Sequence, residues 1–240
     1  MYDRSSVLQS LDANAVAFAI LFGGLTAFMF AWFWLVIRKA ARERQYSVPI
    51  GAVYFWLAHD GTAALGIMEW PGPGSHWFIM FLRCAFIPAT VLDAVLLAQI
   101  IAYGRGELAP WLSQRVYAAS ILAGAAFITA NWLVVMHALH DDLHFISMAL
   151  TIALPLPLIT ATLWRRHACS TLSPLAWTAY TAMVVLYFAS TFTLGGYFHS
   201  WPWILLAAVS CTWGIVLIRM IYAAPPHRVQ QSAVATRPPS

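Results

Sequence analysis

The sequence predicts an all-α, polytopic membrane protein with seven transmembrane helices. Three observations support this fold class: 61% of the 240 residues are hydrophobic, only 9% are charged, and seven apolar runs are long enough to cross a bilayer, which takes about 20 residues each. A soluble domain carries about 25% charged residues. Such a composition excludes a soluble globular protein, and it equally excludes an intrinsically disordered chain.

Sparse charges and turn residues separate the seven predicted spans. In chain order the spans cover approximately Ala15–Ile37, Ser47–Ile67, Trp77–Tyr103, Val116–Met136, Phe145–Trp164, Leu175–Tyr197 and Trp201–Tyr222. Residues 1–222 are therefore expected to form one transmembrane domain. Residues 223–240 are rich in Pro, Ser and Gln and are expected to form a disordered cytoplasmic tail.

The basic residues predict the orientation, because cytoplasmic loops carry an excess of Lys and Arg. One side of the membrane would hold Arg38, Lys39, Arg42, Arg44, Arg105, Arg115, Arg165, Arg166, Arg219, Arg228 and Arg237, and the other would hold Arg4 and Arg83. The N-terminus is thus expected outside or in a lumen, and the C-terminus in the cytoplasm. The net charge of +4 comes mostly from the loops, so it is evidence for this orientation and does not indicate a nucleic-acid partner. The expected partner is the lipid bilayer.

Ionisable side chains inside a membrane span are costly, so each is a candidate functional group. Asp60 is the most informative, because it lies in the middle of the second span within an aromatic stretch that starts at Tyr54. Loss of water favours the neutral form of a carboxyl group. A neutral carboxylic acid among aromatic rings is a candidate general acid. The alternative is a carboxyl group that only joins two helices by hydrogen bonds.

Three other charged residues fall in or beside the predicted spans. Glu69 is expected at the lumenal end of span two, and Arg83 lies about two turns into span three, where it can pair with Glu69 or extend outward. Asp93 lies deep in span three. For Arg83 a structural role is the simpler interpretation.

A histidine-rich stretch follows span four. In a helix His137, either His140 or Asp141, and His144 would share one face, a spacing that suits a metal ion. The stretch falls where the chain must turn, so ordinary loop residues are the competing interpretation. No cofactor or metal is expected, and a metal-dependent membrane enzyme remains an alternative.

Several short motifs are similar to those of a known family, the integral-membrane terpene cyclases of meroterpenoid and indole-terpenoid pathways. The family has a basic stretch followed by Tyr-Ser-Met and then Asn-x-x-Trp-Glu in span two. Here Tyr46-Ser47 follows Arg42–Arg44, and a gapless alignment places Trp56, His59 and Asp60 at the Asn, Trp and Glu positions. The resemblance extends to Asp93 and Tyr103-Gly104 in span three.

The last span resembles the family's Asp-Gly-Thr-Tyr-Gly element, matched here by Ser210-Cys211-Thr212-Trp213-Gly214. The family's acidic pair thus becomes Asp60 and Ser210. Both residues lie about ten residues from the lumenal ends of their spans, so they are expected to face one another at one depth.

The resemblance implies a membrane-bound terpene cyclase, an isomerase or lyase in type, that acts on a prenylated small molecule. Such an enzyme protonates an alkene or a terminal epoxide of a linear prenyl chain, which closes into rings through carbocations. Asp60 would be the acid, and His59, Asp93 and Ser210 would orient it or take the last proton. Aromatic rings would stabilise the moving positive charge. The candidate substrate-binding rings are Tyr54, Trp56, Trp132, Trp177, Tyr187 and Trp213, with Phe55, Tyr180 and Trp203 as further rings.

A different class of function is also compatible with the sequence. A non-enzymatic seven-span transporter or sensor would bind a lipophilic small molecule without changing it. The replacement of the family's second acid by Ser210 favours this alternative.

Overall fold

The computed structural model describes residues 2–66, 75–166 and 172–223, and this part of the chain is helical without strands. Glu69 and residues 224–240 of the predicted tail lie outside the described residues. The helices are α1 (Arg4–Ala13), α2 (Ala15–Glu43), α3 (Ile50–Leu65), α4 (Trp77–Tyr103), α5 (Arg105–Leu108), α6 (Gln114–Leu139), α7 (Phe145–Ala153), α8 (Pro155–Arg166), α9 (Pro174–Phe192) and α10 (Trp201–Ala223), with a 3₁₀ turn, η1 (Gly196–His199), before α10.

Local sequence signals explain where the long helices begin. The side chains of Ser113 and Ser173 accept hydrogen bonds from backbone N–H groups in the first turns of α6 and α9, and such caps satisfy donors that the helix cannot. Pro174 follows its cap at a position where its missing N–H costs nothing. His76 caps α4 in the same way, through Phe78 N–H.

Among the described residues, six helical segments are long and apolar enough to cross a membrane: α2, α4, α6, the combined α7–α8 segment Phe145–Trp164, α9 and α10. The predicted span Ser47–Ile67 contains α3, whose 16 residues make it shorter than the predicted span. The helix begins after Pro49 and ends at Gly66, which takes the left-handed conformation that favours glycine at a helix end. These six helices identify a multi-pass helical membrane protein by length and composition.

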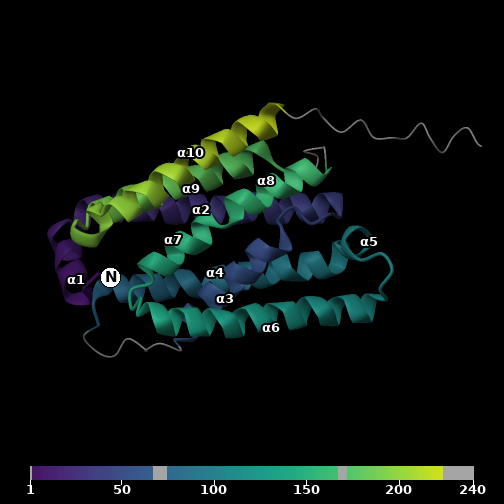
Figure 1. The fold of residues 1–240 in the computed structure, drawn as a ribbon, viewed down its shortest axis with the longest axis horizontal. Coiled ribbons are helices and arrows are strands. Elements are labelled where there is room, and N and C mark those ends of the chain that lie inside the picture. The colour runs from purple at the N-terminus through teal and green to yellow at the C-terminus, as the bar shows by residue number, and fades with distance from the viewer. Residues whose placement is uncertain (1, 67–74, 167–171, 224–240) are drawn as a thin grey trace, which may run out of the picture.

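The predicted span Phe145–Trp164 is correct in extent but broken into α7 and α8 between Leu154 and Pro155. Proline has no N–H for the helical ladder, and its ring collides with the carbonyl one turn earlier, so it interrupts a helix. The short α1 and η1 were not expected. They lie at the end of the bundle where α6 turns into α7, which we call the α1 end (Figure 1).

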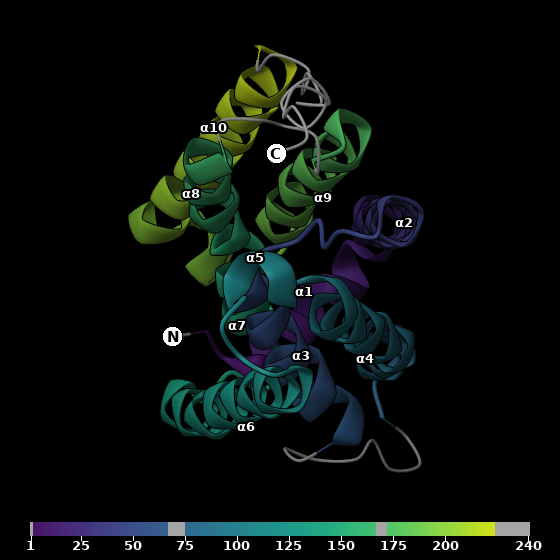
Figure 2. The ribbon, with the colours of Figure 1, turned by 90° about the vertical axis from the view of Figure 1, so that its right-hand side faces the viewer.

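The helices form two groups. In one, α3 packs between α4 and α6; in the other, α9 packs against α2 and α10, with α8 beside α10. Figures 1 and 2 show α7 passing between the groups, and it contacts both α3 and α9. The region beside α7 is therefore where side chains from both groups meet.

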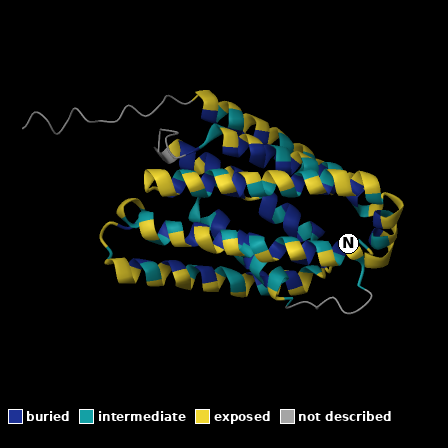
Figure 3. Ribbon diagram, turned by 180° about the vertical axis from the view of Figure 1, so that it is seen from behind, coloured by how far each residue is buried: buried dark blue, intermediate teal, exposed yellow. Residues whose placement is uncertain are grey.

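The outer surface of the bundle is apolar. Figure 3 shows exposed residues along the outward faces of the long helices, and large apolar side chains are among them: Val16, Ile20, Trp34, Leu122, Phe127, Val134, Leu205 and Val209. A soluble monomer rarely exposes so large an apolar surface. Lipid chains are the environment in which this surface is stable.

Candidate functional site

Two adjacent polar residues of α3 lie inside the bundle. His59 is buried, and its Nδ1 atom lies 2.6 Å from Oδ1 of Asp60. The α3 helix turns His59 towards α6 and α7, while Asp60 faces a cavity bordered by α2 and α9. The sequence prediction that His59 could orient Asp60 is consistent with this contact.

Asp93 approaches the same place from α4. Its side chain is 0% exposed, and the carboxyl of Asp60 is close enough to interact with it electrostatically. Neither oxygen of Asp93 has a hydrogen-bond partner of regular geometry among the described residues. Two carboxylates side by side repel one another when both are ionised. Paired carboxyl groups of this kind occur in acid catalysts.

An apolar cavity of about 60 Å³ borders this pair. Its walls come from α2, α3, α4, α7 and α9, and Asp60 is the one carboxyl group among the described residues that line it. The lining consists of Leu25, Met29, Trp32, Phe33, Trp56, His59, Asp60, Phe86, Met148, Thr151, Ile152, Tyr180 and Met183. We call it the apolar cavity. It combines one acid with several aromatic rings.

The predicted aromatic residues divide into those near the apolar cavity and those elsewhere. Trp56 lines it, held by a hydrogen bond from its Nε1 to the Thr151 carbonyl at 2.9 Å. Trp177 packs behind the wall, with its ring centroid 5.2 Å from that of Tyr180. Trp132 packs against His59 at 5.8 Å between ring centroids. These three rings gather around the acid, one in the wall and two behind it.

Tyr187 and Trp213 lie away from Asp60. The hydroxyl of Tyr187 donates a hydrogen bond to the Phe145 carbonyl, near the α1 end. Trp213 is 40% exposed on α10 and donates to Oγ1 of Thr160 at 3.0 Å. Neither lines the apolar cavity. Their contacts indicate helix packing, with Trp213 at the outer surface.

Tyr54 joins α3 to α6. Its hydroxyl donates a 2.9 Å hydrogen bond to the Ile121 carbonyl, and its ring covers Gly124. The absence of a side chain at Gly124 is what lets the two helices approach here, since a Cβ at that position would lie 2.7 Å from the Tyr54 oxygen. Tyr54 is thus placed for helix packing and does not line the apolar cavity.

This contact makes a testable prediction. Gly124→Ala should lower the thermal unfolding temperature in detergent, because overpacking a close contact costs about 1–3 kcal/mol. Gly23→Ala on α2 is the matched control, since no atom would lie within 4 Å of its new Cβ; its unfolding temperature should stay level or rise. Equal stability of Gly124→Ala and the wild type would show that Tyr54 is free to move.

Ser210 does not reach the acid. It is buried on α10, which packs against α9 and α8, and it is not part of the wall of the apolar cavity. The expectation that Asp60 and Ser210 face one another is therefore not met. The side chain brought to Asp60 instead is Asp93, because α3 packs directly along α4.

His144 also belongs to this site, although the sequence analysis grouped it with His137 and His140 as a candidate metal ligand. It precedes α7 with φ of 59°, and its ring meets those of His59 and Phe86 at centroid distances of 5.6 Å and 5.7 Å. Burial, together with the neighbouring His59, lowers the pKa of His144 to about 4, so its imidazole is neutral at pH 7. Nδ1 of His144 and Nε2 of His59 are both buried without a hydrogen-bond partner among the described residues.

The histidine stretch does not form a common face. His140 and His144 both adopt left-handed backbone conformations, so α6 ends at Leu139 and the ring of His144 packs against His59. His137 and His140 stay neighbours at 6.1 Å between ring centroids. Among the described residues, no three His, Cys, Asp or Glu side chains gather closely enough to hold a metal ion.

Asp141 has a structural role in the same turn. It is fully buried, accepts a hydrogen bond from Ser147 N–H at 2.6 Å and accepts another from the Tyr2 hydroxyl. The Tyr2 oxygen in turn accepts the Leu143 N–H at 3.1 Å. This network fixes the start of α7 and the position of His144.

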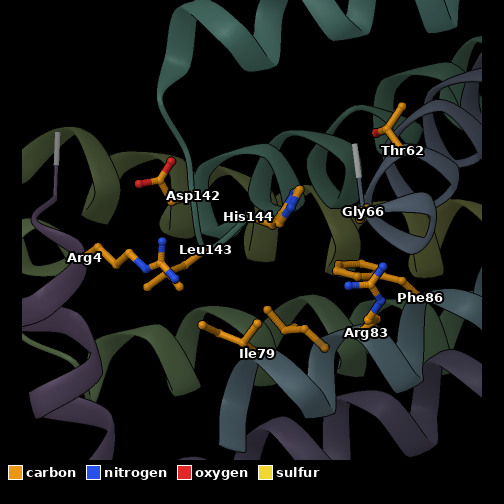
Figure 4. Close-up of a pocket in the computed structure, with 11 residues that line it drawn as sticks. Arg4, Thr62, Gly66, Ile79, Arg83, Phe86, Asp142, Leu143 and His144 are labelled. Atoms are coloured by element: carbon orange, nitrogen blue, oxygen red, sulfur yellow. The ribbon is translucent and has the colours of Figure 1, made fainter. Parts of the chain in front are cut away.

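A second, polar cavity lies at the α1 end and has a volume of about 130 Å³. Arg4, Thr62, Arg83, Asp142 and His144 supply its polar lining, and Phe86 forms part of its wall. Figure 4 shows Arg4 and Arg83 entering from opposite sides, with His144 between them. We call it the polar cavity. Phe86 also lines the apolar cavity, so the two cavities share a wall.

Comparison with known proteins does not extend this description. No family model, curated protein or solved structure matches the chain. The resemblance to integral-membrane terpene cyclases thus remains a prediction from the sequence.

Proposed function

We propose that this protein is a seven-span membrane enzyme that cyclises a lipophilic polyene by acid initiation, with α3 as the seventh span and the N-terminus outside or in a lumen. Asp60 would protonate an alkene or a terminal epoxide of a linear prenyl chain. The observation that carries the proposal is the position of one carboxyl group, Asp60, in the wall of a cavity whose other walls are aromatic and apolar.

The geometry supports the chemistry that follows protonation. A carbocation is stabilised by the faces of aromatic rings, and Trp32, Trp56 and Tyr180 line the apolar cavity. Their centroids lie 4.9 Å apart for Trp32 and Trp56, and 5.4 Å apart for Trp32 and Tyr180. Because this wall has few polar groups, few nucleophiles are available to trap the cation before the rings close.

The proton balance of the reaction is simple. The proton on Asp60 forms a new C–H bond at an alkene carbon, or an O–H bond as an epoxide C–O bond opens. The resulting cation is attacked by the π electrons of the next double bond, and the final cation loses a proton from a neighbouring carbon. His59 or Asp93 would receive that proton and return it to Asp60. The product is an isomer of the substrate.

A second route connects Asp60 with the polar cavity. His144 lines that cavity, its ring contacts that of His59, and His59 contacts Asp60 at 2.6 Å. One ring nitrogen on each histidine has no hydrogen-bond partner among the described residues, so each would be available to accept or donate the proton. This arrangement would restore the proton of Asp60 after an incomplete cycle.

The apolar cavity must enlarge to admit a prenyl chain, because 60 Å³ holds only about two water molecules. Met29, Met148 and Met183 form part of its wall. Methionine is unbranched and adapts its shape readily. These three side chains, contributed by α2, α7 and α9, are the ones we expect to move.

The test uses membranes that contain the protein. They are incubated with linear prenylated compounds, with and without a terminal epoxide, and the extracts are examined for products of unchanged mass. In D₂O one deuterium should enter the product carbon skeleton when an alkene is protonated. Membranes without the protein are the control, and conversion in both samples would contradict the proposal.

The second candidate function is a transporter or sensor for a lipophilic molecule. One observation favours it: Ser210, the residue at the position of the family's second acid, does not line the apolar cavity with Asp60. It predicts saturable binding of the same prenylated compounds with no isomeric product.

A further inference from the structure

The outer surface of α6 carries a polar side chain at membrane depth. Asn131 lies inside the predicted span Val116–Met136, five residues before its end, a rise of about 7.5 Å. It is exposed, and α6 lies at the edge of the bundle, where it packs against α3 and, to a smaller extent, α4 (Figure 2). An amide in contact with lipid chains is costly, because hydrocarbon offers it no hydrogen-bond partner.

The helix itself satisfies only part of this amide. One N–H of Asn131 donates to the Phe127 carbonyl at 2.7 Å. An asparagine side chain has two N–H donors and an oxygen that accepts, so one N–H and the oxygen of Asn131 have no hydrogen-bond partner among the described residues. Unlike lysine or arginine, asparagine is too short to extend to the headgroups. The unused donor and acceptor therefore call for a partner from another polypeptide.

The residues around Asn131 form one continuous exposed face. Side chains that are three, four or seven residues apart share one side of a helix. On the side of Asn131 these are Ser120, Phe127, Val134 and Ala138, and all of them are exposed. We call these five residues the Asn131 face. Steps of three and four residues are the repeat by which two helices pack along a shared seam, and a single asparagine in such a seam fixes the register of the pair.

We propose that the Asn131 face is the contact between two copies of this chain. The two copies pair about a two-fold axis normal to the membrane, and Asn131 exchanges hydrogen bonds with Asn131 of the partner subunit. This inference goes beyond the proposed function and does not depend on the chemistry at Asp60.

A second copy fits this face better than a different protein does. Two copies insert in the same orientation, so a two-fold axis along the membrane normal places the same residue at the same depth in both. An amide is both a donor and an acceptor, so two identical amides complement one another through a pair of N–H···O bonds.

The other residues of the Asn131 face suit close packing of two helices. Phe127 and Val134 are 67% and 70% exposed, so a large apolar side chain flanks the amide on either side along the helix. Ser120 and Ala138 lie at the two ends of the face, and such small side chains let transmembrane helices approach one another closely.

Association is measured in lipid bilayers. Full-length protein, labelled at its terminal amine with a donor or an acceptor fluorophore, is reconstituted into phosphatidylcholine vesicles, and energy transfer is followed as the protein is diluted with lipid. We expect a reversible dimer. Asn131→Leu nearly keeps the volume and removes both hydrogen-bonding groups, so it should weaken association about tenfold, equivalent to about 1.4 kcal/mol. Asn131→Gln keeps an amide and should retain most of the association.

Leu122→Ala is the matched control for these variants. Leu122 is 55% exposed on the same helix. It lies nine residues before Asn131, about two and a half turns, and therefore on the opposite side of α6. Its substitution should leave association unchanged. Thermal unfolding in detergent checks that each variant is folded.

Oxidative crosslinking in membranes tests the geometry without removing Asn131, so it does not depend on the folding of Asn131→Leu. Val134→Cys should form a disulfide-linked dimer. Leu122→Cys should crosslink no more than the parent chain, whose native Cys84 is already exposed.

Four results would overturn the proposal. They are a wild-type monomer at every protein-to-lipid ratio, unchanged association in Asn131→Leu, equal crosslinking from Leu122→Cys and Val134→Cys, and a chain that is monomeric in vesicles but crosslinks through Val134→Cys to a different protein in cell membranes. The last result would replace the second copy with another partner.

Discussion

Asp60→Asn is expected to abolish the isomeric product in membrane incubations, with turnover falling by about a hundredfold or more, the size expected for loss of a general acid. Asparagine has nearly the same volume and keeps a polar contact with His59, so the apolar cavity retains its shape. An amide cannot donate a proton to an alkene. The measurement is product formation per unit of folded protein, with folding checked by monodispersity in detergent.

The control for this variant is Asp12→Asn. Asp12 is an exposed carboxylate that contacts His76 and Trp77 and does not line the apolar cavity. This change should leave turnover unaltered. Undiminished turnover in Asp60→Asn would remove Asp60 as the acid, whatever the control does.

Asp93→Asn is expected to lower turnover less severely, by about tenfold, because Asp93 acts on Asp60 and does not line the apolar cavity. The same substitution should raise the thermal unfolding temperature. Asp93 is buried beside the carboxyl of Asp60 and has no hydrogen bond of regular geometry among the described residues, and two adjacent carboxylates repel one another. The asparagine removes the repulsion between the two carboxyl groups.

The two readouts for Asp93 separate a positioning role from a purely structural one. A structural role alone would change stability and leave turnover per folded molecule unchanged. A loss of turnover as severe as that of Asp60→Asn would make Asp93 the better candidate for the acid. Asp93→Leu extends the series, since it should be more stable still and should have the same defect in turnover.

Helix positions were predictable wherever local signals are strong. Trp77–Tyr103 and Trp201–Tyr222 coincide with α4 and α10 to within a residue, because long apolar runs end at clear turn residues. The length of α3 was not predictable in the same way. Its apolar pattern continues beyond Gly66, and the left-handed end at that glycine depends on the surrounding structure.

The candidate site was predicted in part. Asp60, His59, Asp93 and Trp56 stand out in the sequence because polar and aromatic residues in a span are conspicuous, and the structure brings these four together. Trp32 and Phe86 were missed, since an aromatic residue in an apolar helix carries no sign of which way it faces. His144 was misassigned because its contact with His59 depends on a turn between two helices.

Because α3 is short, the two faces of the membrane would differ in their access to the site. Sixteen residues rise about 24 Å, which is less than the hydrocarbon thickness of about 30 Å, and the polar cavity adjoins the end of this helix. The cavity would then lie beneath the headgroups of one leaflet, as an aqueous recess. Only the acidity of the compartment on that face would reach the carboxyl pair, so the protein would respond to a pH gradient across the membrane in one direction.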